Sequence, residues 1–337
     1  MPPKPQSYLP GPTDRRIDAL LALLAENPTI VISGASIARE IGVKRQTVWK
    51  WIETLRRCGV KVKAHPRTGY HIERVPDVLA PQLISGRLRG ISLGKRILHF
   101  FQTESTNDVA MRLGEDGEPH GTIVIAEKQT AGRGRAGRAW VSEASAGIYV
   151  TILLRPPISP LHAPSLTLAA GLAAREAIAE ECGLPADIRW PNDVMLNSKK
   201  VCGILTEMQA EPDRIHFAVV GMGINVNQAK MPPELCRIAT SLRIETGRTL
   251  SRLELLARLL RRLDDYYNQF ITEGAAGILR QFAAVSSYAE GKRVRIDTGK
   301  ESFVGTTAGL EPSGILRVRR EDGRIELVIT GTVSEAQ

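Results

Sequence analysis

One short segment of the sequence, residues 132–138, holds three arginines and three glycines in seven positions. Glycine lets the backbone fold closely around a ligand and expose its N–H groups. Arginine supplies forked, permanently charged donors that match phosphate or carboxylate oxygens. A flexible arginine–glycine linker or an RNA-binding tract would be longer and repetitive, whereas this single copy lies between two apolar runs, Thr122–Ala126 and Gly147–Leu154, that read as strands. We therefore expect a loop that wraps an anion.

Two adjacent lysines lie beside the bend of a hairpin predicted for residues 194–205. Successive side chains of a strand point to opposite faces, so one of Lys199 and Lys200 should point inward and the other to solvent. Most hairpin lysines only improve solubility. The pair becomes a candidate for chemistry because the anion loop could lie nearby.

Polar groups precede this hairpin and one predicted helix. The tetrapeptide Trp-Pro-Asn-Asp at 190–193 is either a turn with a core tryptophan or a site whose carboxylate holds Mg²⁺ beside a phosphate loop. The residues Ser-Thr-Asn-Asp at 105–108 can cap a helix or hydrogen-bond a polar ligand at its N-terminus. The sequence Gly-Met-Gly at 221–223 lacks a third glycine and a following helix, so we reject a dinucleotide-binding motif.

The pattern of apolar residues predicts an α+β domain with one covered sheet face to position these groups. The expected strands are residues 96–101, 122–126, 147–154, 186–190, 194–196, 201–207 and 216–220, and the expected helices are 107–114, 165–182 and 251–272. After Tyr288 the texture changes to short strands separated by glycine turns, which predicts a small SH3-like β-barrel at 287–337.

The first 75 residues predict a winged helix-turn-helix module. Helices are expected at 14–26, 34–41 and 45–58, and a hairpin wing at 60–73. The third helix would place Val48, Ile52 and Leu55 in the core and leave a polar face for DNA. That face carries Arg45, Gln46, Thr47 and Lys50. A three-helix bundle used only for protein contacts is the alternative.

Charge and composition support this division of the chain. Residues 1–75 carry 13 Lys and Arg against 6 Asp and Glu, while the whole chain has a net charge of +9. A basic module on a nearly neutral body suggests a polyanionic partner for the module alone. No apolar run approaches the ~20 residues that span a bilayer, and four scattered cysteines without paired spacing suit a reducing cytoplasm.

Taken together, the motifs resemble the bacterial bifunctional biotin protein ligase and biotin operon repressor. The similarity is carried by Gln-Thr-x-Gly-Arg-Gly-Arg-x-Gly-Arg-x-Trp at 129–140, Trp-Pro-Asn-Asp at 190–193 and Lys200 followed by Val-Cys-Gly-Ile-Leu. Residues 105–107 and 221–225 also fit, so the resemblance covers almost the whole length. It implies a DNA-binding domain at 1–75, a linker at 76–82, a mixed α/β ligase domain at 83–286 and the C-terminal barrel.

The resemblance implies that biotin and MgATP form biotinyl-5′-AMP, from which biotin passes to a lysine of a biotin carboxyl carrier protein. It assigns Lys200, Arg133 and Arg135 to the reacting centre and Asp193 to Mg²⁺. It implies biotin contacts from Ser105, Thr106, Asn107, Gln129, Gly132, Arg133, Gly134, Arg135 and Lys200. It implies ATP or adenylate contacts from Arg133, Arg135, Arg138, Trp140, Asn192, Lys200 and Asn225.

The family also implies regulation. The adenylate would act as corepressor, favouring a homodimer that binds operator DNA in the cytoplasm. One departure concerns the loop at 228–241, which contains no aromatic residue to cover the adenine, as a tryptophan does in some members. Two rival readings are a lipoate-type ligase, which the arginine–glycine loop with Trp-Pro-Asn-Asp disfavours, and a ligand-sensing repressor without ligase turnover.

Overall fold

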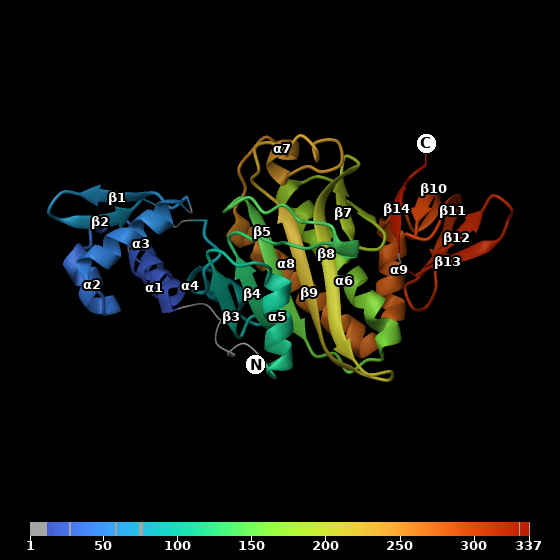
Figure 1. Cartoon of the computed structure of the whole chain (residues 1–337), viewed down its shortest axis with the longest axis horizontal. Helices are drawn as coiled ribbons and strands as arrows, with labels where there is room; N and C mark the ends of the chain where they lie inside the picture. Colours follow the sequence, from blue (N-terminus) through green and yellow to red (C-terminus); the bar gives the residue numbers. More distant parts are fainter. Residues whose placement is uncertain (1–11, 27, 58, 74–76, 330, 337) are drawn as a thin grey trace.

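The computed structural model describes residues 12–26, 28–57, 59–73, 77–329 and 331–336. The expected helix end at Cys58 and the start of the linker at 76 lie outside the described residues. Figure 1 shows three parts along the longest axis: the N-terminal module (blue), the central domain and the C-terminal sheet (red). No helix within the described ranges is both long and apolar enough to cross a membrane.

The N-terminal module has the predicted helices and wing. Helices α1 (Pro12–Glu26), α2 (Gly34–Ile41) and α3 (Arg45–Arg57) are followed by the antiparallel pair β1 (Val62–His65) and β2 (Gly69–Ile72). The Ser33 hydroxyl accepts from the Ser36 N–H at 3.0 Å to cap α2, and Gly42 ends it with φ 72°. The core side chains predicted on α3 are fully buried.

A seven-stranded sheet with the order β3-β4-β5-β9-β8-β7-β6 forms the central domain. Its strands are β3 (Ile97–Phe100), β4 (Thr122–Ala126), β5 (Gly147–Leu154), β6 (Asp187–Arg189), β7 (Asp193–Leu196), β8 (Lys199–Ala210) and β9 (Ile215–Asn225). Only β3 and β4 are parallel among these pairings. The bend between β7 and β8 has Asn197 and Ser198 at φ 46° and 62°, a two-residue turn that matches strand twist.

The prediction of a single covered face is wrong. Helices α6 (Ala163–Cys182), α8 (Arg252–Glu273) and α9 (Ala275–Val285) lie on one side of the sheet, and α5 (Thr106–Glu115) lies on the other (Figure 1). Every position of β4 and β5 is buried, because both faces of these strands are covered. The second core is small and joins α5 to β3, β4, β5 and β9.

The C-terminal part is a five-stranded antiparallel sheet with the order β13-β12-β11-β10-β14. Its strands are β10 (Glu290–Asp297), β11 (Ser302–Leu310), β12 (Leu316–Arg320), β13 (Ile325–Val328) and β14 (Thr332–Glu335). Strand β14 was not predicted, and the SH3-like closure stays a prediction. Shorter elements complete the chain: α4 (Pro81–Ile84), η1 (Ser85–Leu88), η2 (Arg135–Gly137), η3 (Pro160–His162) and α7 (Leu242–Thr246).

Candidate active site

The start of α5 forms one wall of a pocket on the sheet. Ser105 caps the helix by accepting from the Asp108 N–H at 3.5 Å, so the capping interpretation holds. The backbone N–H and the hydroxyl of Thr106 both donate to Oε1 of Gln129, at 2.8 and 3.0 Å. The Gln129 amide nitrogen donates to the Ser142 hydroxyl at 3.4 Å, so both ends of this amide are held at the pocket wall. The residues that begin α5 therefore also line the pocket.

Asn107 reaches the floor of the pocket because β9 offers no side chain there. Its Oδ1 accepts from the Thr151 hydroxyl at 2.7 Å, and its Nδ2 donates to Glu207 Oε2 at 2.8 Å. A Cβ placed on Gly221 would lie 1.9 Å from Asn107 Oδ1. Glycine at 221 is therefore required by the close approach of α5 to the sheet, a role the sequence interpretation missed.

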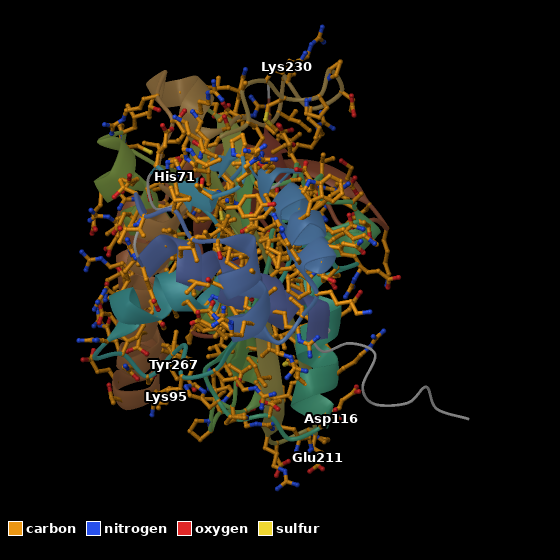
Figure 2. All side chains as sticks on the ribbon, turned by 90° about the vertical axis from the view of Figure 1, so that its left-hand side faces the viewer. His71, Lys95, Asp116, Glu211, Lys230 and Tyr267 are labelled. Atoms are coloured by element: carbon orange, nitrogen blue, oxygen red, sulfur yellow. The ribbon has the colours of Figure 1, made fainter. Side chains whose placement is uncertain are left out.

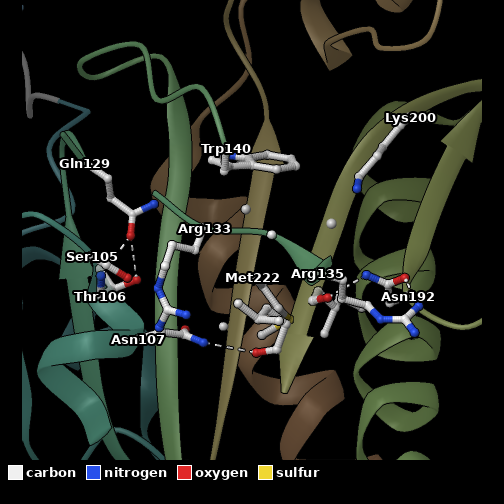
Figure 3. Close-up of a pocket in the computed structure, with 16 residues that line it drawn as sticks. Ser105, Thr106, Asn107, Gln129, Arg133, Arg135, Trp140, Asn192, Lys200 and Met222 are labelled. Atoms are coloured by element: carbon white, nitrogen blue, oxygen red, sulfur yellow. Dashed lines mark hydrogen bonds between the residues drawn. The ribbon is translucent and has the colours of Figure 1, made fainter. Parts of the chain in front are cut away.

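The indole of Trp140, labelled in Figure 3, lies over two glycines that are partners in neighbouring strands. Gly203 of β8 pairs with Gly223 of β9, and Cβ atoms on them would come within 2.8 and 2.5 Å of the ring. The alternation of Gly221 and Gly223 was the available signal, since residues i and i+2 of a strand share one face. The three glycines thus leave room on the sheet for the side chains of Asn107 and Trp140.

Arg133 faces two carboxylates. Its guanidinium contacts Asp108 Oδ1 at 2.5 Å and Glu207 at 3.0 and 3.1 Å, and this pairing raises the pKa of Arg133 against the lowering effect of burial. Figure 3 shows the side chain extending toward Asn107 at the pocket floor. The remaining pocket measures only about 40 Å³, far below the ~300–1,000 Å³ of sites that hold organic ligands. Arg133 must therefore move before such a ligand fits.

The next two arginines of the loop point elsewhere. Arg135 donates to Asn192 Oδ1 at 3.2 Å, and burial lowers its pKa while Asp193 opposes that effect. Arg138 donates to the Thr332 hydroxyl at 2.5 Å, which joins the loop to β14. The arginines of this single loop thus engage three different surfaces.

Lys200 is the lysine that faces the site. Its Nζ lies 2.6 Å from Asp193 Oδ1 and 5.5 Å from the centre of the Trp140 ring. Asp193 is also paired with Arg189 at 2.7 Å. Burial acts to raise the pKa of Asp193, but Lys200 and Arg189 outweigh it and the pKa is lowered. Lys199 lines neither cavity, although it is similarly half-buried.

A larger cavity of about 470 Å³ adjoins the pocket and shares Gly134, Arg135, Trp140, Asn192 and Lys200 with it. Its size is that of an organic ligand site. The loop at 228–239 covers one side with aliphatic side chains. Those aliphatic residues are Met231, Pro232, Leu235 and Ile238, and residues 297–299 and 331–333 of the C-terminal sheet close the other side.

The covering loop is attached to β8 through the backbone of Lys200. Its N–H donates to Ile238 O and its carbonyl accepts from the Thr240 N–H, each at 2.9 Å. Asn225, at the end of β9, donates to Thr240 O at 3.0 Å and lines the cavity. Strand β8 therefore fixes the positions of both Lys200 and the loop that covers the larger cavity.

The predicted site residues converge, with few exceptions. Those lining the pocket are Ser105, Thr106, Asn107, Gln129, Arg133, Gly134, Arg135, Trp140, Asn192 and Lys200, and the larger cavity adds Arg138, Asp193 and Asn225. Gly132 lies beside them, with its carbonyl accepting from the Trp140 N–H at 2.8 Å. Glu207 was missed, and Asp108 and the glycines at 203, 221 and 223 were quoted in motifs without a site role.

Within the described part of the chain, no group of three or more His, Cys, Asp or Glu could hold a metal by itself. Asp193 supplies one ionised carboxylate at the larger cavity, already faced by two cations. This donor set fits a Mg²⁺ ion that is bound mainly by ligand phosphates and water and touches a single protein carboxylate.

The polar face of α3 is a separate candidate site for DNA. Arg45, Gln46 and Lys50 are exposed and Thr47 is half-buried, as the helical spacing predicts. Trp49, on the same helix, is 56 % exposed. Figure 2 looks onto this end of the molecule, with His71 of the wing labelled. Helix α3 packs against α1, α2 and β1 of the same module.

Comparison with known proteins gives one consistent result. The model of the biotin/lipoate A/B protein ligase family matches residues 100–225, a helix-turn-helix domain model matches 15–71, and the biotin protein ligase C-terminal domain matches 291–334. A bifunctional ligase/repressor of Bacillus subtilis is 37 % identical over 90 % of this chain and 94 % of its own. Its counterpart from Escherichia coli is 30 % identical over 94 % and 95 %.

A solved structure is also similar. The biotin protein ligase from Aquifex aeolicus in complex with biotin and ATP has a TM-score of 0.61 and 32 % identity, and the match covers 71 % of this chain and 98 % of that one.

Proposed function

Since the chain belongs to the biotin/lipoate A/B protein ligase family, we propose that it is a biotin protein ligase that also represses transcription. The observation that carries the ligase half is the pair of adjoining cavities that share Arg135, Asn192 and Lys200. Biotin would occupy the pocket beside Ser105 and Gln129, and ATP would occupy the larger cavity. The shared residues lie where the two substrates would meet.

In the first step, a carboxylate oxygen of biotin attacks the α-phosphorus of ATP, and pyrophosphate leaves. Two anions approach each other, so fixed cations that bridge them lower the barrier. Lys200 and Arg135 would supply this charge, and Arg133 would join them after leaving Asp108 and Glu207. Asp193 would help to hold the Mg²⁺ that accompanies ATP, which would supply positive charge for the leaving pyrophosphate.

In the second step, a deprotonated lysine amine of the carrier protein attacks the acyl carbon of biotinyl-5′-AMP, and AMP leaves as the amide forms. The mixed anhydride is prone to hydrolysis, so the site must exclude water before the carrier arrives. Trp140 and the loop carrying Arg133–Arg138 would cover the acyl end. The aliphatic residues Met231, Leu235 and Ile238 would cover the adenine in place of an aromatic side chain.

The repressor half rests on the helix-turn-helix match and the exposed polar face of α3. Arg45 and Gln46 would contact base edges, while Thr47 and Lys50 would contact phosphates. We propose that biotinyl-5′-AMP is the corepressor and favours a homodimer, because one module covers only a half-site. The domain limits at 75, 82 and 286 are part of the same proposal.

The deciding experiment is a single-turnover assay with purified protein, biotin, MgATP and a biotin carboxyl carrier domain. We expect pyrophosphate release followed by biotinylation of one carrier lysine. Lipoate in place of biotin distinguishes the lipoate-type alternative. Binding of biotin without pyrophosphate release would instead identify a sensor that has no ligase turnover.

The three described cysteines are free thiols, which supports the proposed cytoplasmic location.

A further inference from the structure

A cluster of five charged side chains lies where the N-terminal module meets the central domain. The members come from five separate segments: Asp18 of α1, Asp77 before α4, His99 of β3, Glu127 after β4 and Arg252 of α8. Four of them are nearly inaccessible, with exposures of 4 % for Asp18, 1 % for His99 and Glu127, and 0 % for Arg252. Figure 1 shows α1 beside α4 and β3 at this junction.

The contacts run continuously from the DNA-binding module to the ligase core. His99 Nδ1 lies 3.0 Å from Asp18 Oδ1, and its Nε2 lies 3.5 Å from Glu127 Oε1. The guanidinium of Arg252 then pairs with Glu127 at 2.8 Å and with Asp77 at 3.0 Å. Glu127 also accepts from the N–H of Leu79 at 2.8 Å, so the segment between the domains is held as well.

The charges explain why this contact is directional. Burial acts to lower the pKa of His99, but Asp18 and Glu127 oppose it and raise the pKa to about 9. The imidazolium therefore lies between two carboxylates at neutral pH. A buried carboxylate that loses its partner is strongly destabilised, so Asp18 has one favourable position relative to His99.

Apolar packing at the same junction does not carry this directional information. Val78, Ala80 and Phe101 extend the core of the N-terminal module toward the central domain, and such contacts tolerate sliding because the hydrophobic effect is non-directional. The rings of Phe101 and His99 form a T-shaped pair with centroids 4.8 Å apart. The polar cluster is the element that selects one orientation.

The cluster also contacts both ends of the segment between β4 and β5, which carries the arginine–glycine loop at 129–140. Glu127 lies two residues before Gln129, and its carbonyl accepts from the Ser145 N–H at 3.0 Å. Arg252 donates to Gly147 O, at the start of β5, at 3.1 Å. The residues that fix the module are thus bonded to the base of the loop proposed to close over the adenylate.

We propose that Asp18 and His99 are positioning residues, which hold the DNA-binding module in one orientation on the ligase core and so set the half-site spacing that a dimer accepts. This rests on the repressor half of the proposed function. Two modules in fixed orientations can reach two half-sites only at one separation along the duplex. Modules on loose attachments would accept several separations and bind each more weakly.

The first test uses no DNA. Asp18→Asn removes the carboxylate charge, and Glu26→Gln, an exposed position of the same helix, is the matched control. We expect the full-length Asp18→Asn protein to scatter X-rays as a broader ensemble with a larger radius of gyration. The Leu79 amide should exchange hydrogen at least tenfold faster. His99→Gln, which keeps a donor but loses the charge, is the second variant should the first fail to fold.

The second test uses duplexes that the adenylate-bound wild-type protein selects from a random DNA pool. These are then rebuilt as single half-sites and as paired sites with the separation changed by a few base pairs. For Asp18→Asn, we expect at least tenfold weaker binding to the best paired site, a flatter dependence on separation, and unchanged half-site affinity. Ligase kcat and KM for biotin should stay at wild-type values.

The outcomes separate the two proposals. Wild-type protein that selects no DNA site would refute the repressor function, while the scattering and exchange data would still decide whether the cluster fixes the module. Wild-type scattering, exchange and spacing preference in Asp18→Asn would overturn the positioning role. An equal loss of half-site and paired-site binding would also overturn it, because it would show damage to the module itself.

Discussion

Lys199 and Lys200 are neighbours in β8 but have different surroundings. We expect Lys200→Ala to reduce pyrophosphate release by roughly a hundred- to a thousandfold, since losing one preorganised donor costs about 3–4 kcal/mol. Lys199→Ala is the matched control and should change the rate by less than about threefold, because Lys199 lines neither cavity. Single-turnover release of pyrophosphate measures both. Activity retained in the first and lost in the second would reverse the assignment.

Asp108 is the second residue whose role can be isolated. Because Arg133 fills part of the pocket while it contacts Asp108 and Glu207, Asp108→Asn should ease its displacement. An ion pair of this exposure contributes up to about 1 kcal/mol, so biotin should associate roughly two- to fivefold faster in stopped-flow measurements. Asp116→Asn, at the other end of α5, is the control. An unchanged association rate would show that Arg133 does not limit access.

Sequence reasoning succeeded for residues in contiguous motifs and failed for contacts that need the fold. Residue types predicted the arginine loop, whereas the family resemblance supplied Lys200 and Asn192. Spacing alone could not choose between Lys199 and Lys200, since the face of each depends on a register shift between β7 and β8 at Val194. The Asp18–His99 pair, separated by 81 positions, leaves no local pattern at all.

The loop at 129–140 meets the sheet through the indole of Trp140. Trp140 lies on Gly203 and Gly223, so Gly223→Ala should displace the ring at a cost of about 1–3 kcal/mol, typical of overpacking. Gly86→Ala is the control, because Gly86 lines neither cavity and a Cβ there meets nothing within 4 Å. We expect biotinyl-5′-AMP to dissociate at least tenfold faster from the first variant in a chase experiment. Equal dissociation from both variants would remove Trp140 from the cover.

The strands and long helices were predictable because their apolar periodicity is strong, whereas α9 and β14 were missed. The two covered faces of the sheet could not be read from the sequence, because fully apolar strands such as β4 look alike whether one helix layer or two enclose them. The glycines of β8 and β9 can be seen in the sequence, but the sequence does not show that Trp140 packs on them.

The stability of the junction between the N-terminal module and the central domain should depend on pH. His99 has its folded pKa raised to about 9 from 6.5, facing Asp18, Glu127 and, beyond Glu127, Arg252. The contribution of protonated His99 to the free energy of unfolding is therefore complete below about pH 6.5 and is lost as the pH rises through 9. A pKa shift of this size corresponds to roughly 3 kcal/mol of stability.

The measurement is the difference in Tm between wild type and Asp18→Asn. The difference should be largest near pH 6 and should narrow toward pH 9.5, because the neutral imidazole no longer favours the Asp18 carboxylate. Glu26→Gln should show no such trend. A difference that stays constant across this range would mean that His99 does not titrate there.

Strand β14 completes the larger cavity, because its Thr332 hydroxyl accepts from Arg138 and residues 331–333 close one wall. During synthesis, this strand leaves the ribosome after every other described element. The DNA-binding module emerges first and can fold while the ligand site still lacks a wall. A chain released before β14 would therefore carry a folded DNA-binding module beside an incomplete cavity. Under the proposed function, such a chain could reach DNA without responding to the adenylate.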